Sequence, residues 1–504
     1  MRSWRNQTLA LLLFSSFSYA TLYTVGSGKT YTNIAACAAV AKGGDTCDIY
    51  TGTYAGWTQA ANGSAGNLIT FQAHAGETVS VSSSVTINGV SYVHITGLHF
   101  TGTGMDSGIY GNGTSAHNVI DYNTFVDTAY RPTSGYPSAS DSVISHNTVN
   151  FSTKTSSRPG FSVFGDRNLL EYNEIYNGGG DCFHLSGTNV VLRLNNCHDE
   201  DATTSGEHID FMQEGGGAPL LTYSLIENNT EHNCVDPTDN CHFVFMRTSP
   251  TSGNATNNIV RFNFAQNLNG GGSGFGGPGD SVPNTYVYNN TMAIEHVQAS
   301  NGTCLMFQIG APNSASRNNI CYNSTSGYWS PTYNGDIGHT GNGDIAYTTA
   351  WGGSWGSPYS SEATYATLKN VDPNFANYPT DATLSAGSGA IGTGVALTTV
   401  ASGDSGSGTS LVVNDAGFFQ SYASSADCVS VTTVSNHVCI TAIDYGTNTI
   451  TLASGVSRSH GDSVWLYSDS TGRQVLFGTA PNVGAGFDPG SQPAPPTGLA
   501  AVVH

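Results

Sequence analysis

The chain is poor in positive charge. Its 504 residues include only 15 Lys and Arg against 35 Asp and Glu, which gives a formal net charge of −20 at pH 7. Proteins that bind nucleic acid need Lys and Arg to neutralise phosphates, so this composition argues against a nucleic-acid partner. An acidic surface suits a protein that holds cations, and it equally serves to keep a protein soluble.

A long apolar run is also missing. The run Leu9–Phe14 is too short to cross a bilayer, and no later segment is apolar enough, so we expect no membrane span. Basic residues before this run and Ser18-Tyr19-Ala20 after it are typical of a secretory signal peptide over residues 1–20. We therefore expect the mature chain to be a secreted monomer, either released or held at the cell surface.

Ten cysteines in an exported chain predict disulfides. The cysteines fall into close pairs, and the absence of a Cys-x-x-Cys pair disfavours a zinc site. Bridges that close short loops stabilise a fold only modestly. The predicted bridges are Cys37–Cys47, Cys182–Cys197, Cys234–Cys241, Cys304–Cys321 and Cys428–Cys439.

Helical periodicity is absent from the middle of the chain, where short β-rich runs alternate with turns rich in Gly, Asn, Ser and Asp. One Asn-containing phrase recurs there at intervals of 23 to 34 residues. A short period with variable insertions is typical of a solenoid whose insertions form loops. Amide side chains at one turn can bond to each other along the stack. The predicted amide ladder consists of Asn123, Asn147, Asn173, Asn196, Asn229, Asn263, Asn290 and Asn323.

This repeat resembles the right-handed parallel β-helix of the pectate-lyase-like superfamily over residues 21–392. The segment Thr30–Tyr54, an Ala-rich run followed by a strand that ends in Gly-Thr-Tyr, resembles the opening of such proteins, with Asn33 or Thr32 as the cap of a short helix. The resemblance implies an all-β solenoid with an N-terminal capping helix. It implies less about function, because the fold hosts lyases, hydrolases, epimerases, esterases and adhesins.

After about residue 395 the composition shifts to alternating Val, Thr and Ser. This pattern predicts a small antiparallel β domain over residues 393–480, with the last coil as its candidate packing partner. Residues 481–504 are Pro-rich and are predicted to form an exposed tail.

The densest group of chemically capable side chains lies between residues 178 and 247. Aligning residues 181–184 with residues 210–213 places Asp181 beside Asp210, and neighbouring coils lie about 5 Å apart. The same alignment places His184 beside Gln213 and, on a third coil, Arg247 beside Gln213. It also places His242 beside His208. The largest insertions fall on the same coils, which suggests a groove.

Asp181 and Asp210 are the first candidates for catalysis. Two neighbouring carboxylates can hold a divalent cation, or they can act as acid and base in glycoside hydrolysis because repulsion raises one pKa. A separation of about 5 Å favours the retaining geometry. The alternative is structural, since Asp often caps a turn before a strand.

The remaining candidates have equally plain structural alternatives. His184, His208 and His242 could act as bases, substrate contacts or metal ligands, or they could be stacked, partly buried imidazoles. Arg247 could bind a substrate carboxylate, or it could form a surface ion pair. The resemblance to the pectate-lyase-like superfamily implies a third role, because lyases with this fold use Arg or Lys to accept a proton. The predicted substrate contacts are Gln213, Phe211 and Phe245, and a stacked core position is the alternative for both Phe residues.

An acidic loop follows Cys197. Asp199, Asp201 and Glu207 offer several hard oxygen ligands within one segment, which suits Ca²⁺. The spacing does not match an EF-hand, and a solvated acidic turn is the alternative.

Motifs of well-known relatives are absent. The chain lacks the Asn-Thr-Asp and Gly-His-Gly motifs of polygalacturonase-type hydrolases and the Ile-Asp-His motif of common pectate lyases. We predict an exported, cation-assisted lyase that cleaves an acidic, uronate-containing polysaccharide. The alternatives are a glycoside hydrolase that uses Asp181 and Asp210, a C5-epimerase, and a non-catalytic carbohydrate-binding adhesin.

Overall fold

The structure is a computed structural model of the chain. It describes residues 20–101, 107–111, 115–127, 130–131, 139–152, 159–203, 205, 208–215, 220–235, 241–246, 248–249, 253–268, 273–275, 282–293, 305–307, 313–322, 340–347, 371–423 and 425–486. The predicted signal peptide and most of the Pro-rich tail lie outside these ranges.

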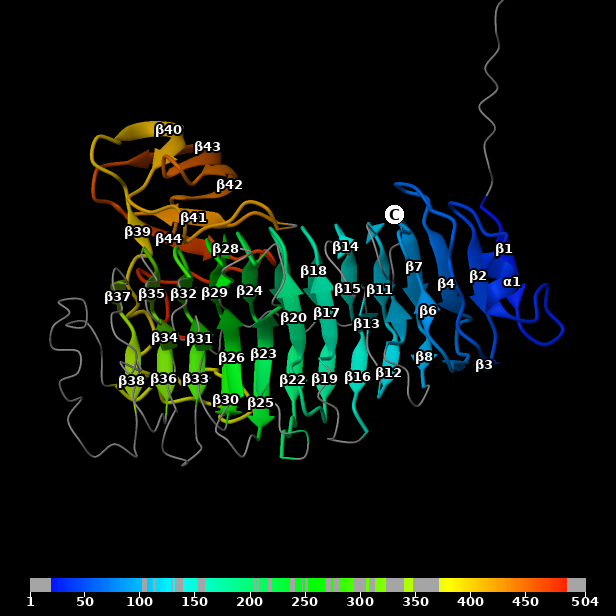
Figure 1. Ribbon diagram of the computed structural model, residues 1–504. Helices are drawn as coiled ribbons and strands as arrows, with labels where there is room; N and C mark the ends of the chain where they lie inside the picture. The colour runs from blue at the N-terminus through cyan, green and yellow to red at the C-terminus, as the bar shows by residue number, and fades with distance from the viewer. Residues whose placement is uncertain are drawn as a thin grey trace, which may run out of the picture.

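Three parallel sheets wind into a β-solenoid, as predicted (Figure 1). The first sheet has 13 strands. In spatial order they are β1 (Leu22–Val25), β2 (Thr46–Ile49), β4 (Ile69–Ala73), β7 (Val93–Thr96), β11 (Val119–Asp121), β15 (Val143–Ser145), β18 (Leu169–Glu171), β21 (Val191–Arg193), β24 (Leu225–Glu227), β29 (Ile259–Arg261), β32 (Tyr286–Tyr288), β35 (Ala315–Arg317) and β37 (Thr340–Asn342).

The second sheet follows the first around each coil and has 12 strands. They are β3 (Gly52–Tyr54), β5 (Val79–Val81), β8 (His99–Phe100), β12 (Thr124–Val126), β16 (Thr148–Asn150), β19 (Glu174–Tyr176), β22 (Asn196–His198), β25 (Thr230–Cys234), β30 (Phe264–Leu268), β33 (Thr291–Ala293), β36 (Ile320–Tyr322) and β38 (Ile345–Tyr347).

The third sheet has nine strands and carries the candidate site. Its strands are β6 (Val85–Thr86), β9 (Ile109–Tyr110), β13 (Tyr130–Arg131), β17 (Phe161–Phe164), β20 (Phe183–Ser186), β23 (Ile209–Glu214), β26 (Cys241–Met246), β31 (Ser273–Phe275) and β34 (Leu305–Phe307). Two short pairs complete the solenoid, β10 (Ser115–Ala116) with β14 (Ala139–Ser140) and β27 (Thr248–Ser249) with β28 (Gly253–Asn254).

Stacked phenylalanines fill the interior behind the third sheet. The ring centroids of Phe161 and Phe183 lie 5.7 Å apart, and those of Phe211 and Phe243 lie 4.7 Å apart in nearly parallel planes. All four side chains are fully buried. Equivalent positions on successive coils thus carry similar apolar groups, because parallel strands in register bring them into direct contact.

The predicted amide ladder is present, with two corrections. Each ladder Asn donates its backbone N–H and its Nδ2 to the Oδ1 of the residue on the next coil, as Asn123 does to Asn147 at 3.0 and 3.1 Å. The member on the fourth coil is Asn195 rather than Asn196, which instead begins β22. Asn319 is also a member, and Asn323 lies outside the described residues. The observed ladder is Asn123, Asn147, Asn173, Asn195, Asn229, Asn263, Asn290, Asn319 and finally Asp344.

The N-terminal helix is short. Helix α1 (Ile34–Ala38) begins after Asn33, whose Oδ1 accepts a hydrogen bond from Ala36 N at 2.9 Å. Ile34 and Cys37 join the solenoid core. The predicted role of this helix as a cap of the coil end stays a prediction.

Four of the five predicted disulfides are present, namely Cys37–Cys47, Cys182–Cys197, Cys234–Cys241 and Cys428–Cys439. Cys304 of the fifth lies outside the described residues. Across the described ranges, no helix is long and apolar enough to cross a membrane.

A six-stranded antiparallel sheet follows the solenoid and packs on its side. The predicted packing of this domain on the last coil stays a prediction, because residues 348–370 lie outside the described ranges. The six-stranded sheet lies over the first sheet near β24, β29 and β32 (Figure 1), where Tyr286, Tyr288 and Phe418 share one apolar cluster. The sheet consists of β39 (Thr398–Thr399), β44 (Ser463–Ser468), β41 (Cys428–Val431), β42 (His437–Asp444), β43 (Thr449–Arg458) and β40 (Gly406–Val412). The exact domain boundaries predicted above remain predictions.

The junction between this sheet and the solenoid holds a buried ion network. Arg261 in β29 is fully buried and forms two bonds to Asp427, at 2.7 and 2.8 Å. Its Nε lies 2.7 Å from Glu227, and its Nη1 lies 2.7 Å from the hydroxyl of Tyr288. A guanidinium with this many partners keeps the charged groups satisfied inside the protein.

Candidate functional site

The candidate site lies on strands β20, β23 and β26 of the third sheet. Two consecutive residues of each strand, such as Phe211 and Met212, point into the core, and the residues on either side of them face outward. Gln213 pairs in register with His184 on one side and Phe245 on the other. The outward residues therefore form two columns, Asp181, Asp210 and His242 in one and His184, Gln213 and Phe245 in the other.

The register between the first two coils agrees with the prediction, and the register to the third coil does not. Asp210 pairs with His242 and Gln213 pairs with Phe245, so the alignment of His208 with His242 was wrong by two residues. The buried pair Phe243 and Val244 sets this register, because these residues occupy the inward positions next to Phe211 and Met212. Arg247 lies outside the described residues.

Asp181 sits beneath the surface, between Asp210 and His184. Its Oδ1 accepts a hydrogen bond from Asp210 N at 2.7 Å, and its Oδ2 is in contact with His184 Nε2. Burial, followed by the nearby charge of Asp210, raises the pKa of Asp181 above its ordinary value. A carboxyl group with a raised pKa can exchange a proton with an imidazole that it contacts.

Asp210 is fully buried and holds two histidines. Its Oδ1 lies 3.0 Å from His242 Nδ1, and its Oδ2 lies 3.4 Å from His208 Nε2. Burial alone would raise the pKa of Asp210, but the two neighbouring imidazoles, His208 and the hydrogen-bonded His242, outweigh it and lower the pKa. The pKa values of the two carboxyl groups are thus shifted in opposite directions, upward for Asp181 and downward for Asp210.

The histidines are the groups that reach solvent. The side chains of His208, His184 and His242 are 35%, 25% and 13% exposed, whereas Asp210 is completely covered. A proton shared between His242 Nδ1 and Asp210 leaves His242 Nε2 as an acceptor, which is the tautomer that a general base needs. No described residue bonds to His242 Nε2.

The two predicted aromatic contacts have different positions. Phe211 is fully buried in the core stack, so it does not reach the surface, and its expected role in substrate binding is corrected. Phe245 is partly exposed, and its ring lies 5.8 Å from that of His242. Gln213 is nearly buried, and its amide lies 3.1 Å from His208 Nε2.

Two buried acids beneath the site were not among the predicted site residues. Glu231 in β25 is fully buried between Cys197 and Ala265, and neither of its oxygens has a hydrogen-bond partner in the described part of the chain. Burial, and then the charges of Asp210, Glu200 and Asp181, raises its pKa well above the ordinary value. Glu231 occupies an inward position whose counterparts on the neighbouring coils are apolar. That exception to the apolar pattern could have identified it from the sequence.

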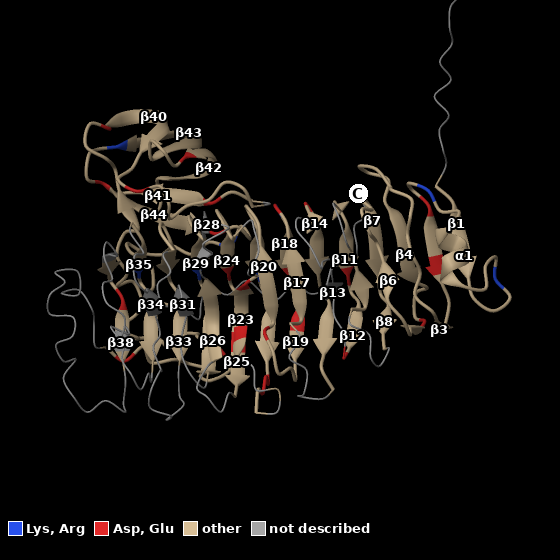
Figure 2. Ribbon diagram, in the orientation of Figure 1, with Lys and Arg blue, Asp and Glu red and all other residues tan. Residues whose placement is uncertain are grey.

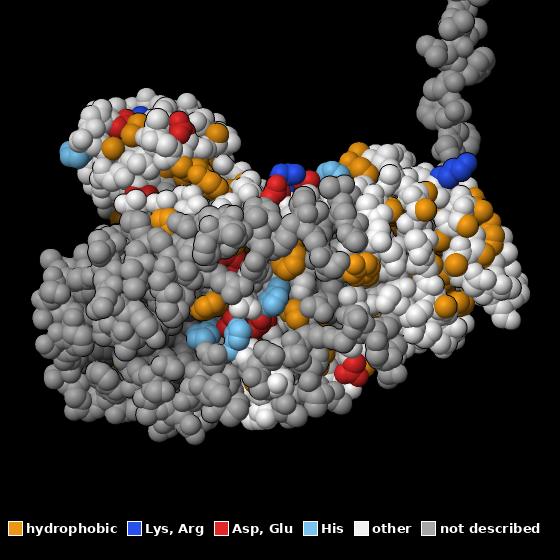
Figure 3. Space-filling view, in the orientation of Figure 1, with side chains coloured by type: hydrophobic (Ala, Val, Ile, Leu, Met, Phe, Trp, Pro, Cys, Tyr) orange, Lys and Arg blue, Asp and Glu red, His pale blue; other side chains and the backbone are white. Residues whose placement is uncertain are grey.

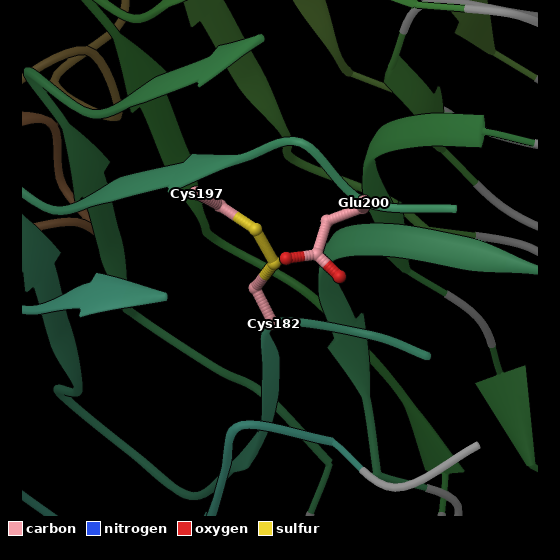
Figure 4. A group of neighbouring side chains, drawn as sticks. All are labelled: Cys182, Cys197 and Glu200. Atoms are coloured by element: carbon pink, nitrogen blue, oxygen red, sulfur yellow. A yellow bond between two sulfur atoms is a disulfide. The ribbon is translucent and has the colours of Figure 1, made fainter. Parts of the chain in front are cut away.

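Glu200 lies beside the disulfide Cys182–Cys197 (Figure 4). These three residues are close enough to hold a metal, but the two sulfurs are bonded to each other and offer no thiolate. The space for the carboxylate comes from Gly178, because a Cβ there would lie 2.2 Å from Glu200 Oε2.

The group that could hold a cation is Asp181, His208 and Asp210, whose ligand atoms all lie within 4.8 Å of one another. The two described acids of the predicted calcium loop do not converge on one point but bond to nearby protein groups. Asp199 accepts hydrogen bonds from His198 and Asn233, and Asp201 caps the turn at Thr203. Glu207 lies outside the described residues.

The described strands of this surface carry no positive Lys or Arg side chains. The sequences of β17, β20, β23 and β26 contain no Lys or Arg, and Figure 2 shows acidic segments on β19 and β23 without basic ones. In the space-filling view, pale-blue histidines surround red acidic atoms in a hollow over these strands (Figure 3). Imidazoles are thus the only basic side chains in the sequences of these four strands.

No protein-family model and no curated protein sequence matches the chain. Three solved structures illustrate its fold similarity. A GH136 lacto-N-biosidase from Eubacterium ramulus has a TM-score of 0.49 and 10% identity over 65% of this chain and 68% of its own. A PL6 family polysaccharide lyase from Pseudopedobacter saltans has a TM-score of 0.48 and 16% identity over 71% of this chain and 94% of its own.

The third structure is an alginate lyase from Paenibacillus sp. str. FPU-7, with a TM-score of 0.42 and 14% identity over 65% of this chain and 97% of its own. The names of these proteins describe different reactions, and the similarity to them is one of fold alone. The activity of the present chain has to be argued from its own residues.

Proposed function

We propose that the chain is an exported polysaccharide-degrading enzyme that cleaves an acidic glycan by β-elimination. The contact between Asp210 Oδ1 and His242 Nδ1, 3.0 Å long, carries this proposal. It orients an imidazole whose other nitrogen can accept a proton, at a surface hollow where a sugar chain can lie. The disulfides fit an oxidising compartment and support export.

In the proposed reaction, His242 Nε2 takes the proton from the carbon next to the uronate carboxylate. A carbon–carbon double bond forms, the bond to the glycosidic oxygen breaks, and the departing oxygen takes a proton from His208. Asp210 stabilises the imidazolium that His242 becomes. His184, whose Nε2 contacts Asp181, offers its other ring nitrogen to the substrate carboxylate as a hydrogen-bond donor.

A divalent cation fits the group formed by Asp181, His208 and Asp210, since two carboxylates and one imidazole are all metal-ligating types. When bound, it would neutralise the substrate carboxylate and acidify the neighbouring carbon. His208 would then be a ligand, so the departing oxygen would take its proton from water instead. The nitrogen ligand and the small number of oxygens favour a transition metal over Ca²⁺, which prefers six to eight oxygens.

A glycoside hydrolase is the second candidate. The opposite pKa shifts of Asp181 and Asp210, together with their proximity, support it, because such a pair can divide the roles of acid and nucleophile. The burial of both carboxylates behind the histidines argues against it, since each oxygen would have to touch the glycosidic bond.

The deciding experiment follows ultraviolet absorbance and reducing ends together on a panel of acidic and neutral polysaccharides. For the lyase, both signals rise together on a uronate polymer, and His242→Ala lowers kcat/KM by about 10²–10⁴-fold. His94→Ala is the matched control, because His94 also faces outward and pairs with an Asp of the next coil, at 2.8 Å, but on the first sheet.

If reducing ends form without a rise in ultraviolet absorbance, the enzyme is a hydrolase and not a lyase. Full activity of the His242→Ala enzyme would rule out the proposed base. A protein that cleaves nothing in the panel, yet binds one of its polysaccharides, would favour the adhesin alternative.

A further inference from the structure

A second polar pocket lies where the C-terminal sheet meets the solenoid. Its volume is about 390 Å³, and residues of both parts line it. The solenoid residues come from the first sheet and the turns that lead into it, whereas the histidine site lies on the third sheet. The two sites therefore occupy different faces of the solenoid.

Four residues of this pocket occupy the same position on successive coils. Tyr223, Asn257, Asn284 and Asn313 each lie two residues before a strand of the first sheet, namely β24, β29, β32 and β35. All four have left-handed φ angles between 48° and 60°. Asn tolerates this conformation well, and neighbouring coils are about 4.8 Å apart, so the backbone holds a regular row of polar side chains.

Much of the hydrogen-bonding capacity of this row is unused. The side-chain amides of Asn257 and Asn313 and the hydroxyl of Tyr223 bond to no described residue. Asn284 makes one bond, from Nδ2 to Thr256 Oγ1 at 3.3 Å. The C-terminal sheet adds Tyr445, whose ring lies 5.3 Å from that of Tyr223 at an angle of 43°. Amides and tyrosine rings together suit a ligand with many hydroxyls and an apolar ring face.

Charge is nearly absent from the pocket. Its lining residues include no Lys, Arg or His, and the one acid, Asp415, accepts hydrogen bonds from Tyr286 Oη at 3.0 Å and Gly417 N at 2.9 Å. Gly417 packs directly against the ring of Tyr286 in this wall, because a Cβ on Gly417 would lie 2.1 Å from that ring. An anionic ligand would find no cationic partner among these residues.

We propose that this pocket binds a neutral oligosaccharide. The amides of Asn257, Asn284 and Asn313 exchange hydrogen bonds with hydroxyls of successive sugar residues, and Tyr223 with Tyr445 contacts the ring faces. Such a site would hold the protein on an uncharged glycan while the histidine site works on another face. It requires no catalysis, so its test is independent of the proposed lyase reaction.

The test measures binding of cellohexaose, xylohexaose, mannohexaose and hexagalacturonate to the full chain by titration calorimetry. We expect at least one neutral hexasaccharide to bind and hexagalacturonate not to occupy this pocket. Tyr223→Asn should weaken that binding about tenfold, the order expected for one lost aromatic contact. It places at this turn the residue that the neighbouring coils already carry, so the backbone conformation is preserved.

Asn257→Asp should weaken the same binding by removing two amide donors at an unchanged φ, since Asp141 already adopts a φ of 52°. Asn189→Asp is the matched control, because Asn189 precedes β21 by two residues with a φ of 58° but does not line the pocket. Thermal unfolding of each variant verifies that it folds. His242→Ala should bind the neutral hexasaccharide normally, which separates this pocket from the catalytic hollow.

Three results would overturn the proposal. The first is that no neutral hexasaccharide binds at millimolar concentration. The second is that the two pocket variants and Asn189→Asp bind equally well. The third is that hexagalacturonate competes for the pocket with equal affinity.

Discussion

Two regions of this molecule bury carboxylates, and they satisfy them differently. At the junction with the C-terminal sheet, Arg261 bonds to both Asp427 and Glu227 inside the protein. Around the third sheet, Asp181 and Asp210 have imidazoles as partners, and Glu231 has no hydrogen-bond partner among the residues that the structure describes.

The difference separates a structural network from a reactive one. A guanidinium keeps its charge at any physiological pH, so the buried carboxylate of Asp427 always has a counter-charge. An imidazole gains and loses a proton near neutral pH, so the site can exchange protons with a substrate. Burial alone therefore does not identify a functional carboxylate, and the chemistry of its partner does.

The largest expected effect belongs to Asp210→Asn. The amide cannot stabilise an imidazolium, so kcat should fall about 10³–10⁴-fold as the tautomer of His242 changes. The variant should unfold at nearly the wild-type temperature, because no buried charge is left unpaired. Steady-state kinetics and calorimetry check both statements. A large loss of stability with modest loss of activity would place Asp210 in the structural class instead.

The converse is expected for Arg261→Met. Removing the guanidinium leaves Asp427 and Glu227 buried without their counter-charge, which should lower the free energy of unfolding by about 3–5 kcal/mol. The kcat of the folded variant should be unchanged, because the junction is remote from the third sheet. Urea unfolding measures the effect. Arg167→Gln is the control, since the exposed pair Arg167–Asp141 should contribute less than about 1 kcal/mol. Equal losses for both variants would contradict the contrast between buried and exposed pairs.

A divalent cation should stabilise the third-sheet site and not the junction, and the expected effect is smaller. Added at about 100 times its Kd, it should raise the free energy of unfolding by about 2.7 kcal/mol through the Asp181, His208 and Asp210 group. Asp181→Asn should abolish this rise, and Asp199→Asn in the acidic loop should preserve it. Thermal shifts with Ca²⁺, Mn²⁺ and Zn²⁺ after EDTA treatment measure the effect. Loss of the shift in Asp199→Asn alone would return the metal to the loop.

The smallest effect concerns Glu231 and pH. Its folded-state pKa lies well above the ordinary value of 4.5, so the folded chain takes up a proton that the unfolded chain lacks above that pH. Wild-type stability should therefore fall as the pH rises above 4.5, and Glu231→Gln should flatten this decline. Glu174→Gln, at an exposed position of the same sheet, is the control. If the stability of wild type and of Glu231→Gln falls equally with rising pH, Glu231 does not hold a proton in the folded chain.

The solenoid was predictable because its signals are periodic. Asn147 and its counterparts recur with the coil, and the disulfide pairs are local in sequence, so neither needs long-range information. The pairing of Asp181 with Asp210 followed from the same repetition. The choice of Asn195 over Asn196 was not predictable, because only the fold decides which amide enters the turn.

The rest depends on contacts that repetition does not encode. The register of His242 is set by which two residues of β26 enter the core, and both candidate alignments place apolar residues there. Glu231 was missed because a charged residue on a short strand is normally taken as exposed. The packing of the C-terminal sheet on the first sheet joins residues far apart in the sequence, such as Arg261 and Asp427, which are 166 residues apart.

The amide ladder has a direction, and its last rung differs from the others. Each Asn donates to the side-chain oxygen of the next member toward the C-terminal end, and the last member within the described residues is Asp344, which receives two bonds from Asn319 and one from Ser316. A carboxylate offers acceptors but not the two N–H donors of an amide, so it cannot repeat the bond that each Asn makes to the next coil. Continuing the same donor pattern by one repeat would therefore require Asn at position 344.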